Sequence, residues 1–221
     1  PLPILYLLSN GLYFIIYHVV AYRKKVVYTN LKNSFPEKSE VELTKIAKEF
    51  YQHFCDYIVE CLRLVSISAS EFKRRVKIKN PELFQKYYEE NRKLKKYKIM
   101  KDYRSRFGLK LIKIGNFRTE IKDYAKERVA LFFIADQCPS GRQKAHWMNF
   151  LNQETAVMMG AEVYSKRYDY VAVAMNTTKV KRGYYELSFE IVEDLPKQSD
   201  SGFITEQSTR ILEREIQEAP A

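Results

Sequence analysis

Residues 170–192 read YVAVAMNTTKVKRGYYELSFEIV, the stretch that decides the fold class. The runs 170–175 and 184–192 are rich in Val, Ile, Phe and Tyr, side chains that favour β-strands. Arg182 and Gly183 lie between the two runs, at a position that suits a hairpin turn. This stretch therefore predicts two strands joined by a turn.

Further strands and helices are expected on both sides of this pair. Strand-like runs cover residues 109–114 and 129–135, and residues 130–135 carry no polar side chain, as in a strand covered on both faces. Helical stretches are expected near residues 119–126, 153–167 and 205–217. This alternation predicts an α/β fold: a layered domain with a mixed sheet flanked by helices.

A long helix is predicted in the first half of the chain. Ser39 and Glu42 have the spacing of a capping box, which opens helices. The helix that follows has a long apolar face, formed by Leu43, Ile46, Ala47, Phe50, Phe54, Tyr57, Ile58, Cys61, Leu62 and Val65. Ser68 and Glu71 repeat the capping signal.

Residues 1–22 contain no Asp, Glu, Lys or Arg, and Arg23, Lys24 and Lys25 follow at once. About 20 apolar residues suffice to cross the hydrocarbon core of a bilayer, and basic residues favour the cytoplasmic side. We therefore expect a membrane anchor at 1–22 and one α/β domain at 23–221. A buried core helix, or two short interfacial helices broken near Asn10 and Gly11, are the alternatives.

The formal net charge is +11, and one window accounts for the whole excess. Residues 73–113 hold 16 Lys or Arg against four acids. Such a cluster attracts phosphates on nucleic acid, on anionic lipid or on an acidic carrier protein. Beside a membrane anchor we expect it to face anionic lipid headgroups, although a solvated helical surface is the simpler reading of any single lysine. No RNA-binding signature accompanies it, so nucleic acid is not expected as a partner.

Several segments, in order along nearly the whole chain, resemble the late acyltransferases of lipid A biosynthesis, within the lysophospholipid acyltransferase superfamily. The likeness is greatest to those of Bacteroidetes-type bacteria. The segments that carry it are 22–27, Asn30-Leu31, 34–36, 53–56, 104–108, 133–139, 150–155, Gly160 with Glu162, and 182–186.

The resemblance implies an acyltransferase-type domain at the cytoplasmic face of the inner membrane. The enzyme would move a fatty acyl group from an acyl thioester, on acyl carrier protein or CoA, to a hydroxyl of a lipid A precursor or related phosphorylated lipid. Its partners would be the membrane lipid acceptor, the acidic carrier protein or CoA, and anionic headgroups. The thioester is a co-substrate, and neither a resident cofactor nor a metal is implied.

The family uses a His-x4-Asp/Glu motif, in which the histidine acts as general base on the acceptor hydroxyl. Five residues after His18, His53 and His146 stand Arg23, Ile58 and Leu151, so the motif is absent and the catalytic residues are unknown. Asn80 and Pro81 suit the N-cap and first position of a helix that is expected to end near Arg92. In the family the motif follows this helix, and about 30 residues are missing near 92–98. The resemblance also implies that the C-terminal tail is truncated here, since the family continues past the position of residue 220 into a Trp/His/Arg-rich tail.

Two explanations for the missing motif remain open. Either the natural protein carries the segment, or the chain lacks its catalytic strand and is an inactive, membrane-bound protein that binds anionic lipid. We favour the first, because losing a central strand would disrupt the sheet.

Five residues are candidates for substrate binding. Asp136 and Gln137 follow the apolar run at 129–135, and ligand sites of α/β sheets lie at the carboxyl ends of strands. An Asx turn before Pro139 is the alternative for this pair. Arg104 and Arg106 suit bidentate phosphate binding, and Arg182 could face a phosphate from its turn. The alternative for Arg104 and Arg106 is a solvated helix end, and the alternative for Arg182 is a hairpin turn with no binding role.

Overall fold

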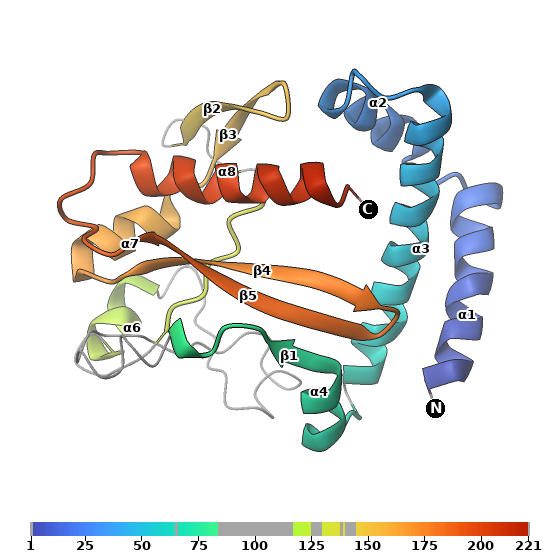
Figure 1. Ribbon diagram of the computed structural model, residues 1–221, viewed down its shortest axis with the longest axis horizontal. Helices are drawn as coiled ribbons and strands as arrows, with labels where there is room; N and C mark the ends of the chain where they lie inside the picture. The colour runs from blue at the N-terminus through green and yellow to red at the C-terminus, as the bar shows by residue number, and fades with distance from the viewer. Residues whose placement is uncertain are drawn as a thin grey trace.

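The computed structural model describes residues 2–64, 66–83, 117–124, 130–137, 139 and 145–220 (Figure 1). The predicted strand at 109–114, Arg104, Arg106 and the break near 92–98 lie outside the described residues. The elements are α1 (Leu2–Phe14), the π-helix η1 (Ile15–Val19), α2 (Lys24–Ser34), α3 (Glu40–Leu64), α4 (Ala69–Arg75), β1 (Val76–Ile78), α6 (Phe117–Tyr124), β2 (His146–Phe150), β3 (Gln153–Val157), α7 (Gly160–Tyr168), β4 (Ala172–Lys181), β5 (Tyr184–Glu193) and α8 (Phe203–Glu218).

A mixed sheet in the order β1-β5-β4 forms the centre of the described structure. β4 and β5 pair antiparallel across the predicted turn, and β1 runs parallel to β5. The Asn80 side chain prolongs this parallel pairing, since its amide donates to Phe189 O at 2.7 Å and its oxygen accepts from Phe189 N at 3.0 Å. The predicted α/β class with a mixed sheet flanked by helices is confirmed.

The helices surround the β4–β5 hairpin (Figure 1). α8 runs along the hairpin. α6 and α7 lie near the open end of the hairpin, where β4 begins and β5 ends, and α3 lies beside its turn. α1 lies outside α3, antiparallel to it. The hairpin turn is therefore the place where the N-terminal helices meet the sheet.

The predicted helix starts are confirmed. Ser39 N donates to Glu42 Oε2 at 2.9 Å, and Glu42 N donates to Ser39 Oγ at 3.3 Å. These are the reciprocal bonds of a capping box. Ser68 caps α4 by accepting from Glu71 N at 3.1 Å. Local side-chain to backbone bonds thus fix where both helices begin.

Two predicted elements are wrong. Residues 130–137 form no strand, and Phe132 and Ile134 are 44% and 49% exposed. No described strand pairs with this segment, and without a partner its backbone gains no ladder hydrogen bonds. Residues 153–157 were expected to be helical, but they form β3, which pairs antiparallel with β2.

The β2–β3 turn explains the second error. Leu151 and Asn152 have φ values of 49° and 61°. This is the left-handed backbone of a two-residue hairpin turn. Glycine usually signals such a turn, and this one contains none. Leu151 N donates to Glu213 Oε1 at 2.6 Å, so a carboxylate of α8 holds the turn in place.

A buried carboxylate joins α7 to α8. Glu162 accepts from Gly202 N at 2.6 Å, from Thr205 N at 3.0 Å and from Thr205 Oγ1 at 2.7 Å. Burial opposes ionisation, but these bonds outweigh it, so the pKa of Glu162 lies below its ordinary value. The charge also faces the positive end of the α8 dipole. Glu162 therefore caps α8 from a neighbouring helix.

We expect Glu162→Gln to lower the free energy of unfolding by about 1–3 kcal/mol, because the amide group cannot accept from all three donors. Urea titration of the purified protein in detergent measures this loss. The matched control is Glu206→Gln in the first turn of α8, where the side chain is 45% exposed. This control should change the free energy of unfolding only slightly, by about 0.5 kcal/mol at most. Equal losses in both variants would contradict the capping role.

Candidate functional site

The structure separates the two groups of predicted site residues that it describes. Asp136 and Gln137 are exposed on the irregular segment 130–137. Phe133 in this segment stacks on Tyr164 of α7 and lies beside Gly160. Arg182 lies in the hairpin turn, at the far end of β4 and β5 from α7 (Figure 1). The pair and the arginine therefore do not form one site, and their substrate-binding roles stay predictions.

The Arg182 guanidinium binds a buried carboxylate. Its Nε lies 3.0 and 2.9 Å from the two oxygens of Asp56, which is 1% exposed on α3. Its terminal nitrogen also donates to Asp56 Oδ1 and, at 2.8 Å, to Asn10 Oδ1. The guanidinium carbon lies 4.3 Å from the centre of the Tyr6 ring. Arg182 therefore links the turn to both α3 and α1.

Asp56 has further partners. Ser9 Oγ donates to Asp56 Oδ1 at 2.7 Å from a position on α1 that is fully buried. Lys179 Nζ lies 3.7 Å from the other oxygen. The helix α1, the strand β4 and the hairpin turn thus supply donors to one carboxylate, as a buried charge requires if it is to remain ionised.

A second carboxylate lies one helical turn further along α3. Glu60 accepts from the hydroxyl of Tyr6 at 2.8 Å and from the hydroxyl of Tyr185 at 2.6 Å. Residues i and i+4 share one face of a helix, so Asp56 and Glu60 face the same way. We call Ser9, Asp56, Glu60, Arg182 and Tyr185 the α1–α3 clamp, because these residues join α1, α3 and the hairpin.

The electrostatics of the clamp keep Asp56 charged and its neighbour His53 neutral. Burial alone would raise the pKa of Asp56, but the bonds from Arg182 and Ser9 and the positive charges outweigh it, so that pKa lies below its ordinary value. Burial lowers the pKa of His53, and the adjacent Lys179 ammonium, 3.2 Å from His53 Nδ1, lowers it further. Asp56 is therefore a poor proton acceptor near neutral pH, and the clamp is built for positioning.

The histidines pack against other residues rather than forming a catalytic pair. The His146 ring lies so close to Gly202 (φ +90°) that a Cβ there would come within 2.7 Å of it. His18 stacks on Phe14, and His53 contacts Lys179. No histidine in the sequence has an acid five residues later, so the family's general base is not among these three.

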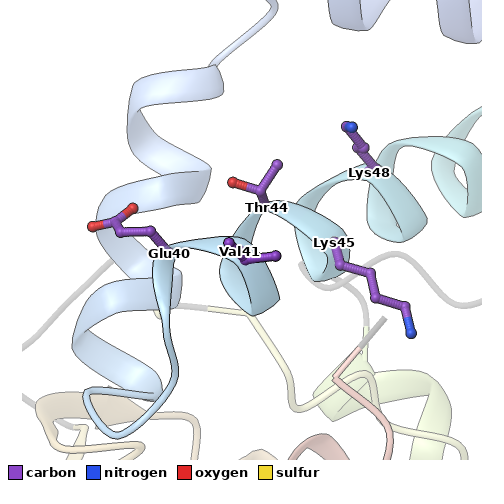
Figure 2. A pocket seen from close by; sticks show the side chains of 5 residues that line it. All are labelled: Glu40, Val41, Thr44, Lys45 and Lys48. Carbon is purple, nitrogen blue, oxygen red and sulfur yellow. The ribbon is translucent and has the colours of Figure 1, made fainter.

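One hollow lies on the first turns of α3 (Figure 2). Figure 2 shows that its side chains diverge along a single helix; they are Glu40, Val41, Thr44, Lys45 and Lys48. Glu40 is already paired with Lys32 at 2.6 Å. Among the described residues there is also no group of three or more His, Cys, Asp or Glu able to hold a metal ion. Neither feature offers a catalytic arrangement.

A family comparison covers the whole chain. The model for bacterial lipid A biosynthesis acyltransferases matches residues 1–95 and, in a second segment, residues 87–221. The chain belongs to the bacterial lipid A biosynthesis acyltransferase family. No curated protein matches it in a sequence search. The predicted family is confirmed, and a transferase is the class of protein that the match supports.

Sequence reasoning missed the clamp of this acyltransferase-family chain. In the sequence, Asp56 stands out only as a member of the family-like segment 53–56. A usable signal was present on the N-terminal helix. Tyr6, Ser9 and Tyr13 recur at spacings of three and four within an apolar run, which places a polar stripe on one side of the helix. Such a stripe predicts that this side of the helix packs against polar residues elsewhere in the protein.

We expect Arg182→Gln to destabilise the protein by about 3 kcal/mol, because it leaves Asp56 buried without its main counter-charge. The double variant, Asp56→Asn with Arg182→Gln, should lose less free energy of unfolding than the sum of the losses in the two single variants, since the two side chains are coupled. Urea titrations of the four proteins give the coupling energy. Additive losses would show that the two side chains act independently. Lys197→Gln, at an exposed pair far from the clamp, is the control for losing one positive charge.

Asp56 also predicts an acid dependence. Its pKa in the folded state is below the ordinary value, so the unfolded chain takes up the proton first as the pH falls. The stabilisation is complete above roughly pH 5 and is lost progressively as the pH falls below about 4, the ordinary pKa of an aspartate. The stability of Asp56→Asn should therefore fall less between about pH 5 and about pH 3 than that of the wild type. The exposed control Glu154→Gln should follow the wild type, and an equally steep fall in Asp56→Asn would contradict the assignment.

Proposed function

We propose that this protein transfers a fatty acyl group from an acyl thioester, on acyl carrier protein or CoA, to a hydroxyl of a lipid A precursor or related phosphorylated lipid. The acceptor oxygen attacks the thioester carbonyl, a C–O ester bond forms, the C–S bond breaks, and the released thiol takes the proton. The family match along the whole chain is the observation that carries the proposal.

A membrane location supports a lipid acceptor. Residues Leu2–Val19 form a helical stretch of 18 residues with mean hydropathy 1.4, of which only 17% is buried in the protein. A core helix of a water-soluble protein with this composition would be mostly covered. We therefore infer attachment to the inner membrane with the domain on the cytoplasmic side, where the thioester donors and the basic residues of 73–113 would meet.

The catalytic pair is expected on the strand and loop that the family carries and that this sequence lacks near residues 92–98. The two matched segments overlap at residues 87–95, beside the place where the sequence predicts a missing strand and loop. Peptide mapping of the natural protein across 87–106 would detect a segment carrying His-x4-Asp/Glu. Direct continuity there would favour the second candidate function, an inactive protein that binds anionic lipid at the membrane.

Transfer itself is tested with the purified natural protein, a lipid A precursor and either acyl carrier protein or CoA thioesters. Mass spectrometry should show an acceptor heavier by one acyl group with at least one donor. No acylated product from a correctly folded, full-length protein would contradict the enzyme and leave the lipid-binding candidate.

The Asp136 prediction is checked in the same assay. Asp136→Ala should lower the transfer rate about 10- to 100-fold, the size expected when one hydrogen bond to a charged or polar headgroup is lost. Its circular dichroism spectrum should stay unchanged, because Asp136 is exposed. Glu154→Gln, an exposed acid on β3, should transfer at the wild-type rate. A wild-type transfer rate in Asp136→Ala would contradict the substrate-binding role and leave Asp136 a purely structural residue of its loop.

A further inference from the structure

The helix formed by α1 and η1 has its polar side against the protein. Tyr6 and Ser9 bind the carboxylates of α3, and Asn10 accepts from Arg182. Near the other end, Tyr17 is 4% exposed and packs on Tyr51, whose hydroxyl donates to Tyr22 O. These contacts run along the whole length of the helix, so it is fixed to α3 from one end to the other.

The opposite side of the same helix is apolar and uncovered. Its large apolar side chains are between 50% and 71% exposed; they are Ile4, Leu7, Leu8, Phe14, Ile15 and Val19, followed by Val20 at the C-cap. A surface helix of a water-soluble protein turns its apolar stripe inward and its polar side outward. This helix does the reverse, which is the arrangement expected where lipid is the surrounding medium.

α3 cannot follow α1 across a bilayer. Its exposed charged residues include Lys45, Lys48 and Glu49. Each charged side chain costs about 2.5–3.5 kcal/mol at the centre of a membrane helix. Because α1 is bonded to α3 along its length, a crossing by α1 alone would break the α1–α3 clamp. The exposed apolar side must therefore meet lipid while α3 stays outside the hydrocarbon core.

Positive charges lie at both ends of the helix. Arg23 and Lys25 are exposed directly after its C-terminal end. At the N-terminal end, Arg182 contacts the carbonyl of Tyr6, and Arg75 reaches the neighbouring Gly183 carbonyl at 3.3 Å. Exposed cations on α4 and at the end of β4 include Lys73, Arg74 and Lys181. A transmembrane helix with the positive-inside pattern would carry an excess of cations at one end.

We propose that α1 and η1 lie in the plane of an anionic phospholipid surface, with the apolar side in one leaflet and the flanking cations on the headgroups. The helix is thus an interfacial anchor that does not span the bilayer. This inference rests on the membrane location in the proposed function. It replaces the single crossing that composition alone allows with a geometry that keeps the clamp intact.

The test measures depth at positions along the exposed side. In a Trp147→Phe background, which removes the one native tryptophan, single tryptophans replace Ile4, Leu8, Ile15 and Val19. The full-length variants are bound to phosphatidylethanolamine/phosphatidylglycerol vesicles with bromines at defined acyl-chain depths. Quenching of tryptophan fluorescence then reports the depth of each position. Gln198→Trp, in the exposed loop before α8 and far from α1 in Figure 1, is the matched control.

We expect the same shallow depth at all four positions and no quenching of the control. In a spanning helix Ile4 and Val19 would be separated by about 22 Å along the membrane normal, with the greatest depth midway between them. That graded pattern would overturn the proposal. Absence of quenching at all four positions would overturn it together with the membrane location.

A second measurement does not depend on the tryptophan background. Lys73→Gln, Arg74→Gln and Lys181→Gln combined should weaken binding to the anionic vesicles roughly 100-fold, about fivefold for each cation. The control is a triple variant at the other end of the β4–β5 hairpin from its turn: Lys122→Gln, Arg167→Gln and Lys197→Gln. It removes the same charge and should change binding by about fivefold at most. Equal weakening by both triples would overturn the assigned orientation.

Neither measurement uses acyl transfer, so the two proposals can fail separately. Equal depths in a protein that transfers no acyl group would contradict the acyltransferase activity and support the interfacial helix. Acylated product from a protein with the graded depth pattern would support the activity and contradict the interfacial helix.

Discussion

The buried ion pair between Asp56 and Arg182 is the interaction on which the arrangement of the N-terminal half depends. A charged carboxylate that is 1% exposed is tolerated only where donors surround it, and here α1 and the hairpin bring them to α3. Removing any one of these elements would leave charge in a poorly solvated place. The pair therefore ties the position of α1 to the position of the sheet.

The same requirement accounts for the unusual composition of α1. Its polar residues are needed on the side that faces Asp56 and Glu60, which leaves the apolar residues to face outward. A protein in water would gain nothing from this arrangement, whereas a lipid surface solvates the outer side without disturbing the inner one. In the proposed interfacial position the helix thus anchors the protein while remaining part of the folded domain.

The sequence predicted the features that depend on local or periodic patterns. The strands around Arg182 and Gly183 follow from β-branched and aromatic residues, and the starts of α3 and α4 follow from capping residues that bind the adjacent backbone. On α3 the predicted apolar face is only partly right. Ile46 is buried as expected, yet Tyr57 and Leu62 are 53% and 64% exposed, because the carboxylates of the clamp turn that part of the helix toward α1 and β5.

Features that depend on distant residues were not predictable in this way. The β2–β3 turn is held by Glu213 from α8, and α8 itself is capped by Glu162 from α7, contacts that no local pattern reveals. The run 130–135 looks like a covered strand because apolar residues suit either a strand or an irregular segment packed through Phe133. Of the candidate site, the sequence singled out Arg182, as a residue to face a phosphate, but not its partner Asp56, whose role appears only when α1, α3 and the turn are brought together.

Hydrogen exchange on vesicles, followed by mass spectrometry, tests most directly whether the ion pair holds α1 in place. The measurement compares wild type with Arg182→Gln and reads the exchange of the backbone amides of α1 and α8. The account predicts a larger increase of exchange in α1 than in α8, since the clamp holds α1 to α3 and the hairpin, whereas none of its residues lies on α8. Unchanged exchange in α1, with the variant otherwise folded, would show that Asp56 and Arg182 do not position the helix.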